Sequence, residues 1–181
     1  MRFASMRNLD ISNGEGVGVS LFVQGCDRHC FNCFNPDTWD FNGGKEWTEE
    51  TKNKFIKLID RPYINRISVL GGEPLAEQNL DEVLSLIKEI RILFPEKTIW
   101  LYTGYNFDLL KLEYNEYKLY AANPTISPVR WEIISNVDVL VDGEYIDEQK
   151  DLSLKFRGSK NQRVIDVKQS LAQNKIVLYC D

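Results

Sequence analysis

Short apolar runs alternate with longer segments of helical apolar spacing along most of this chain. Four of the short runs are rich in apolar and β-branched residues, which is typical of buried strands. These four runs are Val17–Gln24, Arg66–Leu70, Thr98–Tyr102 and Val137–Val141. Two weaker strand candidates follow near the end of the chain, Val164–Val167 and Lys175–Tyr179.

Helical periodicity fills most of the intervals between these strands. Thr48–Ile59 has an apolar face and begins with Thr48, a residue type that favours the N-cap position. Leu80–Phe94 is the clearest predicted helix, because six apolar residues share one stripe. The stripe consists of Leu80, Val83, Leu84, Ile87, Ile90 and Leu93. Asn106–Leu119 is a further predicted helix, and Leu119–Ser135, with its two prolines, predicts a loop that contains a short helix.

Strands that alternate with helices indicate βαβ units and a mainly parallel sheet. A complete eightfold barrel typically needs about 250 residues, and this chain has 181. The pattern therefore predicts an α/β fold, either an open, partial (β/α) barrel or a doubly wound sheet. No linker-like segment divides the chain, so we expect a single domain over residues 1–181.

An unusual loop follows each of the four strong strands. The loops are Gly25-Cys26, Gly71-Gly72-Glu73-Pro74, Thr103-Gly104-Tyr105 and Asp142-Gly143-Glu144. In α/β folds the carboxyl ends of parallel strands carry the active site. We therefore predict that these four loops lie on one face of the molecule.

The charge balance narrows the range of partners. The formal net charge is −5, which argues against a general nucleic-acid binder, although Lys155–Arg163 is locally basic. No run approaches the roughly 18 apolar residues that cross a bilayer, and the N-terminus lacks the apolar stretch of a secretory signal. We expect a cytoplasmic protein with no membrane partner, in which clustered thiols indicate metal or redox chemistry.

Three of the four cysteines, Cys26, Cys30 and Cys33, form a C-x3-C-x2-C pattern around the only histidine, His29. Structural zinc needs a fourth ligand, which would have to be His29, adjacent to Cys30, or Cys180, next to the last residue of the chain. An iron–sulfur cluster held by three cysteines leaves one iron open to a substrate. The pattern favours the cluster, with His29 outside the ligand set and Cys180 an incidental thiol.

The order of the motifs resembles the radical S-adenosylmethionine superfamily, in which C-x3-C-x2-C follows the first strand and G-G-E-P follows the second. Further stretches resemble the anaerobic ribonucleoside-triphosphate reductase activating proteins, and R-G-S-x-N-Q is the most diagnostic of them. The matching stretches are Asn13–Gly16, Leu21–Cys26, Asn35–Trp39, Trp100–Tyr105, Val139–Gly143 and Phe156–Arg163. Together they run from about residue 13 to residue 167, nearly the whole chain.

This resemblance implies a partial, open barrel of the radical S-adenosylmethionine type and a defined chemistry. Cys26, Cys30 and Cys33 would hold a [4Fe-4S] cluster, whose fourth iron binds the amino and carboxylate groups of S-adenosylmethionine. One electron, supplied by a donor such as a flavodoxin, would cleave the cofactor into methionine and a 5′-deoxyadenosyl radical. That radical would take a hydrogen atom from a glycine of the partner reductase and leave a glycyl radical there.

The resemblance also implies contacts with the methionine part of the cofactor. Gly71 and Gly72 have no side chains, so backbone groups can approach that part closely. Glu73 could accept a hydrogen bond from its ammonium group, and Pro74 stiffens the turn. The alternative interpretation of the two glycines is a plain turn that ends a strand.

Other expected cofactor contacts are less specific. Asn32 and Phe34 flank Cys33 and are expected near the adenosyl part, although many superfamily members have an aromatic residue where this chain has Asn32. Thr103 and Asp142 follow the next two strands, where they would line the cofactor or the entry for the target glycine, or simply serve turns and caps.

Some alternatives stay open at this level. The basic residues Arg157, Lys160 and Arg163 either dock a partner or form a solvated surface. The chain could also activate a different glycyl-radical enzyme, or be a non-enzymatic metal-binding module that docks on a larger protein. A radical enzyme with a small-molecule substrate is disfavoured, because such members typically need more chain.

Overall fold

The computed structural model describes residues 1–119 and 128–180. The elements, in chain order, are β1 (Arg2–Asp10), β2 (Gly18–Val23), η1 (Pro36–Thr38), β3 (Lys45–Glu46), α1 (Glu49–Ile59), β4 (Arg66–Gly71), η2 (Glu77–Asn79), α2 (Leu80–Leu93), β5 (Thr98–Tyr102), α3 (Phe107–Leu119), α4 (Val129–Ser135), β6 (Val139–Asp142), η3 (Asp147–Gln149), β7 (Arg163–Asp166), α5 (Val167–Gln173) and β8 (Leu178–Cys180). Within Leu119–Ser135 the short helix is confirmed as α4, and residues 120–127 lie outside the described part.

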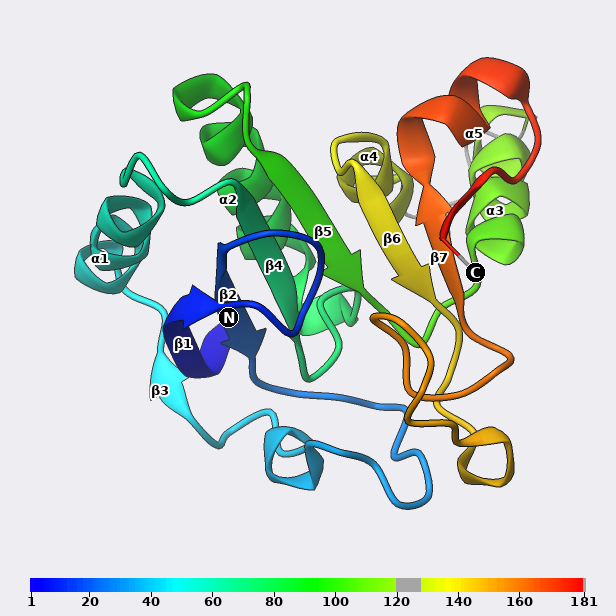
Figure 1. Cartoon of the computed structure of the whole chain (residues 1–181), viewed down its shortest axis with the longest axis horizontal. Helices are drawn as coiled ribbons and strands as arrows, with labels where there is room; N and C mark the ends of the chain where they lie inside the picture. The colour runs from blue at the N-terminus through cyan, green and yellow to red at the C-terminus, as the bar shows by residue number, and fades with distance from the viewer. Residues whose placement is uncertain (120–127, 181) are drawn as a thin grey trace.

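The strands of the described chain form one sheet in the order β3-β1-β2-β4-β5-β6-β7-β8 (Figure 1). The four central strands, β2, β4, β5 and β6, pair in parallel. At both edges the pairing is antiparallel, between β1 and its neighbours β2 and β3, and between β7 and its neighbours β6 and β8. The predicted α/β class is confirmed, but the expectation of a mainly parallel sheet holds only for the centre.

The six predicted strands and the predicted helices are present, whereas β1, β3 and α5 were not predicted. β1 (RFASMRNLD) buries only Phe3 and Asp10, so its apolar pattern is too weak to indicate a strand. It is positioned by antiparallel pairing with β2 instead. β3 is two residues long and α5 is seven, so neither is long enough to show a clear periodicity of apolar residues.

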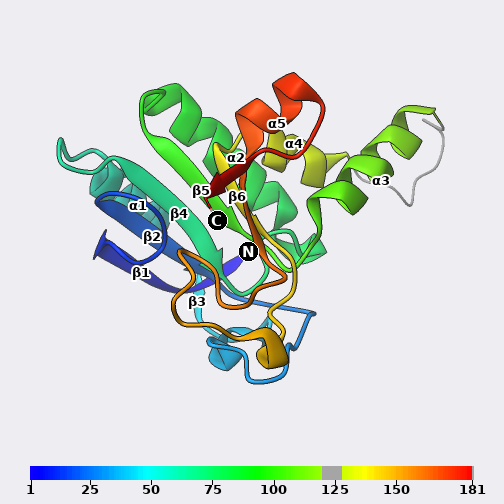
Figure 2. The same cartoon turned by 45° about the vertical axis from the view of Figure 1, so that its right-hand side comes forward.

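The α-helices cover one face of the sheet, as Figure 2 shows. Their buried side chains pack on alternate strand residues such as Leu21, Val69 and Leu101, and this is the main core. Thr48 caps α1 as predicted, because its side chain accepts a hydrogen bond from the backbone N–H of Thr51.

In α2 the predicted apolar stripe is partly wrong. Leu86 is fully buried, whereas Leu84 is only partly buried and Leu93 is 49% exposed. The helix therefore presents a slightly rotated face to the sheet, and its last turn projects beyond the core.

The opposite face of the sheet carries a smaller apolar cluster of Trp100, Val139, Val141 and Val164. Cys180 packs against this cluster from β8, where it pairs in register with Val164. No helix of the described chain is long and apolar enough to cross a membrane.

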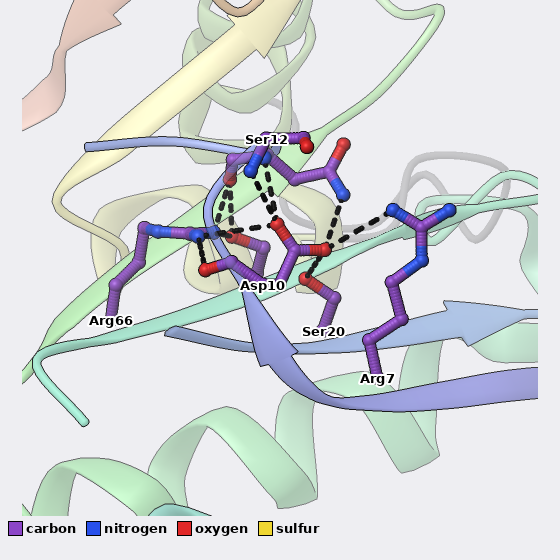
Figure 3. Close-up of polar contacts among 7 residues, drawn as sticks. Arg7, Asp10, Ser12, Ser20 and Arg66 are labelled. Atoms are coloured by element: carbon purple, nitrogen blue, oxygen red, sulfur yellow. Dashed lines mark hydrogen bonds and ion pairs between the residues drawn. The ribbon is translucent and has the colours of Figure 1, made fainter. Parts of the chain in front are cut away.

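A buried ion pair between Asp10 and Arg66 lies beside the start of β4 (Figure 3). Arg66 is fully buried and donates from Nη2 to the backbone carbonyl of Asp10 across 2.7 Å. The Asp10 carboxylate also accepts hydrogen bonds from the backbone N–H of Ser12 and from the hydroxyl of Ser20. These bonds hold the loop between β1 and β2 against the sheet.

Candidate active site

A cleft of about 680 Å³ opens beside the carboxyl ends of the parallel strands. Its walls include residues from all four strand-end loops, among them Cys26, Glu73, Thr103 and Gly143. The prediction that these loops share one face is therefore confirmed. The loop after β6 also lines the cleft and lies beside the cysteine loop in both cartoon views (Figures 1 and 2).

The cysteine loop turns sharply twice and places Cys26, Cys30 and Cys33 in this cleft. His29 and Asn32 have left-handed backbone angles, with φ of 49° and 54°, which are uncommon for residues other than glycine. The backbone N–H of Cys33 donates to the carbonyl of Cys30 across 3.1 Å and closes the second turn. All three thiols are partly buried.

The thiols of this loop ionise only with difficulty. Burial raises the pKa of Cys26 to about 11 and also raises the pKa of Cys30, so each thiolate needs a nearby positive charge. Among the described residues, no group of three or more His, Cys, Asp or Glu side chains converges closely enough to hold one metal ion.

The Glu73 side chain is almost completely buried in the wall of the cleft, with 1% exposure. Its Oε1 accepts hydrogen bonds from the backbone N–H of Leu75 and the hydroxyl of Thr103, each at 2.8 Å. Its Oε2 accepts one from the backbone N–H of Gly104 at 2.7 Å. Burial raises the pKa of Glu73 to about 7, although these bonds favour the charged form. The residue predicted to bind an ammonium group therefore also ties β4 to β5.

Gly71 and Gly72 are required by internal packing. Gly71 has φ of 107°, and a Cβ on Gly72 would lie 2.4 Å from the carbonyl oxygen of Gly25. The backbone N–H of Glu73 donates to that same oxygen across 2.7 Å. The glycines thus allow the loop after β4 to pack directly on the turn that precedes Cys26.

Comparison with known proteins agrees with this geometry. A family model described as a 4Fe-4S single cluster domain matches residues 12–165. Three relatives are each named anaerobic ribonucleoside-triphosphate reductase-activating protein. The proteins of Salmonella typhi, Escherichia coli (strain K12) and Enterobacteria phage T4 are 36%, 35% and 34% identical, over 91% of this chain and 97%, 97% and 93% of their own.

This chain belongs to the anaerobic ribonucleoside-triphosphate reductase-activating protein family. The matched region contains the three cysteines and every strand-end loop of the cleft.

In this member of the activating-protein family, one of the two residues that flank Cys33 lines the cleft and the other does not. Phe34 lines the cleft and packs against Tyr145, with ring centroids 4.9 Å apart. Asn32 does not line the cleft, and its side-chain amide donates to Asp147 across 2.9 Å. Together with the ion pair between Arg28 and Glu144 at 3.7 Å, this ring contact and this hydrogen bond join the cysteine loop to the loop after β6.

Asp142 also points away from the cleft. Its buried carboxylate accepts a hydrogen bond from the backbone N–H of Phe107 across 2.8 Å and pairs with Arg163. It is not among the residues that line the cleft. We predicted cofactor contact for Asp142, but its contacts in the described chain join β6 to β7 and α3.

The stretch R-G-S-x-N-Q of this activating-protein family member holds the loop after β6 in place. The Gln162 side chain accepts from the backbone N–H of Gly158 across 2.9 Å and donates to the carbonyl of Gly143 across 2.9 Å. Of the basic residues, Arg163 is neutralised by Asp142 and Asp108, Arg157 lines the cleft, and Lys160 is exposed.

His29 packs on Trp39, with ring centroids 4.7 Å apart, and does not line the cleft. Sequence reasoning missed Arg28, which lines the cleft and contacts the ring of Tyr105. The only sequence signal for Arg28 was its place between two of the predicted ligands, and nothing in the sequence paired it with Tyr105.

Proposed function

We propose that this chain activates an anaerobic ribonucleoside-triphosphate reductase by forming a glycyl radical on it, with a [4Fe-4S] cluster and S-adenosylmethionine as cofactors. The observation that carries the proposal is the placement of three partly buried thiols, Cys26, Cys30 and Cys33, in one cleft among the strand-end loops. The names of the relatives supply the reductase as the protein substrate.

The cofactors would supply one-electron cleavage of S-adenosylmethionine to a radical that takes a hydrogen atom from a glycine. The three thiolates would bind the iron atoms and keep one iron accessible from the cleft. Glu73 would accept a hydrogen bond from the ammonium group of the cofactor. Gly72 would keep the backbone of the loop after β4 close to the cysteine loop.

The sheet would act as an open, partial barrel, in which the cleft stays accessible to a segment of another protein. Two apolar side chains support this role, because Phe34 and Leu152 line the cleft and are 56% and 82% exposed. Exposed apolar side chains at the mouth of a cleft are typical of protein interaction sites. A cytoplasmic location, a single domain and an electron donor such as a flavodoxin complete the proposal.

Anaerobic reconstitution with iron and sulfide tests the cofactor part. We expect about four irons per chain and a paramagnetic signal of the reduced cluster that changes on addition of S-adenosylmethionine. Stoichiometric zinc without such a signal would contradict the proposal and favour a metal-binding docking module.

The partner is tested by mixing the reduced protein with an anaerobic ribonucleoside-triphosphate reductase and S-adenosylmethionine. We expect a glycyl radical signal on the reductase together with release of 5′-deoxyadenosine. A radical that forms only on a different glycyl-radical enzyme would show that the reductase is the wrong partner.

A further inference from the structure

Arg28 projects from the cysteine loop to Tyr105, in the loop after β5. Its guanidinium carbon lies 3.8 Å from the ring centroid of Tyr105. Its two closest acidic partners, Asp27 and Glu144, are both 3.7 Å away and are largely exposed. The Nε atom is buried and has no hydrogen-bond partner among the described residues. Arg28 thus lines the cleft with unused hydrogen-bonding capacity.

Arg28 and Glu73 approach the same point of the cleft wall from two sides. A Cβ placed on Gly104 would lie 3.0 Å from Cγ of Arg28 and 3.4 Å from Oε2 of Glu73. The two groups influence each other electrostatically, but the ion pairs found in the described chain do not include one between them. The cleft therefore presents a cation and an anion side by side, each able to take a further ligand group.

An α-amino acid carries one ammonium group and one carboxylate on the same carbon. A guanidinium beside a carboxylate complements this pair of charges, because charge-assisted hydrogen bonds are the strongest that side chains form. The flat guanidinium also suits a carboxylate better than an ammonium group does. The Tyr105 ring fixes the plane of the guanidinium on the cleft wall.

We propose that Arg28 binds the carboxylate of the amino-acid part of S-adenosylmethionine, next to the ammonium group that Glu73 accepts. This inference rests on the proposed function and adds a residue that determines which ligand the cleft selects. A ligand without the carboxylate gains nothing from Arg28.

Arg130 contacts the same ring and offers a matched control. Its guanidinium carbon lies 5.0 Å from the Tyr105 centroid. It does not line the cleft, and it donates to the backbone carbonyl of Leu75 across 2.9 Å and to Glu77 across 3.1 Å. Arg130→Gln therefore removes an equal charge and a ring contact outside the cleft.

The test measures dissociation constants on the cluster-loaded protein by anaerobic equilibrium dialysis. The probes are S-adenosylmethionine and decarboxylated S-adenosylmethionine, which lacks only the carboxylate. We expect Arg28→Gln to weaken binding of S-adenosylmethionine by about tenfold to a hundredfold. Its affinity for the decarboxylated probe should stay the same within about twofold. Arg130→Gln should leave both constants unchanged, and Arg28→Lys should recover part of the loss because it keeps the charge.

The outcomes separate the two proposals. Equal weakening of both probes by Arg28→Gln, or no weakening of either, overturns the role of Arg28 while the proposed function stands. Failure of the cluster-loaded wild-type protein to bind S-adenosylmethionine overturns both. Iron content and circular dichroism of each variant show whether the fold and the cluster are intact.

Discussion

The hydroxyl of Thr103 donates a hydrogen bond to Oε1 of Glu73 across 2.8 Å, although the two residues are 30 positions apart. This bond joins the end of β5 to the loop after β4 inside the cleft wall. Because Glu73 is buried, its carboxylate depends on this hydroxyl and on two backbone N–H groups for stabilisation. The relationship makes the stability of the cleft dependent on pH.

Glu73→Gln should change the pH dependence of unfolding. The pKa of Glu73 is raised from 4.5 to about 7 in the folded protein. The folded state therefore keeps a proton that the unfolded state releases, and the stabilisation present below pH 4.5 is lost as the pH rises through 7. Between pH 4.5 and pH 7 the free energy of unfolding of the wild type should fall by on the order of 3 kcal/mol relative to that of Glu73→Gln. Anaerobic urea unfolding over this range measures the difference.

Glu82→Gln, an exposed substitution on α2, serves as the control for the lost charge. Thr103→Val should steepen the pH dependence of the free energy of unfolding, because it removes a hydrogen-bond donor that favours the charged form of Glu73. Parallel pH profiles for wild type and Glu73→Gln would contradict the burial argument.

Asp10→Ala should be strongly destabilising, because it leaves the Arg66 guanidinium buried without its ion-pair partner (Figure 3). Such a loss typically costs about 3–5 kcal/mol. Combining it with Arg66→Met should cost less than the sum of the single changes, since the unpaired charge is then absent. Additive costs in chemical denaturation would show that the pair is not coupled.

The Asp10 carboxylate predicts the opposite pH response to that of Glu73. Burial opposes the charged form of Asp10, but hydrogen bonds from Asn13, Ser12 and Ser20 outweigh it and hold the pKa well below its usual value. Its stabilisation is therefore present above the ordinary aspartate pKa and is lost as the pH falls below it. Asp10→Asn should remove this acid sensitivity in urea unfolding measured below pH 4.

Cys33→Ala should abolish formation of 5′-deoxyadenosine and lower the iron content, because it removes one of the three thiols in the cleft. Cys180→Ala provides the comparison, since Cys180 packs against the smaller apolar cluster and does not line the cleft. It should keep both iron and product. An iron assay measures the iron content of each variant, and chromatography of the reaction mixture measures 5′-deoxyadenosine. Loss of both in Cys180→Ala but not in Cys33→Ala would refute the ligand assignment.

Gly72→Ala should disturb the cysteine turn, because its Cβ would lie 2.4 Å from the Gly25 carbonyl oxygen. We expect a loss of more than about 2 kcal/mol in stability and a lower iron content. Gly16→Ala adds the strain of a left-handed backbone without a steric clash, since nothing lies within 4 Å. It should cost about 1 kcal/mol and leave the iron content unchanged. Equal iron loss in both variants would argue against the packing explanation.

Leu152→Asp should weaken binding of the reductase without affecting cleavage of S-adenosylmethionine. Leu152 is 82% exposed at the cleft, so an added charge would disfavour an apolar protein contact while leaving the core intact. The expected result is a higher KM for the reductase in glycyl radical formation, with normal reductive cleavage of S-adenosylmethionine alone. Leu112→Asp, at an exposed position on α3, should change neither.

Local patterns in the sequence were sufficient to predict most elements and the four strand-end loops that meet at the cleft. The apolar runs gave β2, β4, β5 and β6, because a strand buried on both faces reads as a continuous apolar segment. The strand-end loops could be assigned to one face because parallel strands end at the same edge. The clustered cysteines needed no long-range information, since three thiols within one loop are placed in the cleft by two local turns.

Tertiary structure alone decided the contacts between distant residues. β1 lacked a clear apolar period and was positioned by pairing with β2. Asp142 ended a strand as predicted, but Arg163 drew its carboxylate away from the cleft. Arg28 reached Tyr105, and Thr103 reached Glu73, only because the loops after β2, β4 and β5 close on one another. Periodicity records which face of an element is apolar, whereas the partner of a polar side chain depends on how the chain closes in space.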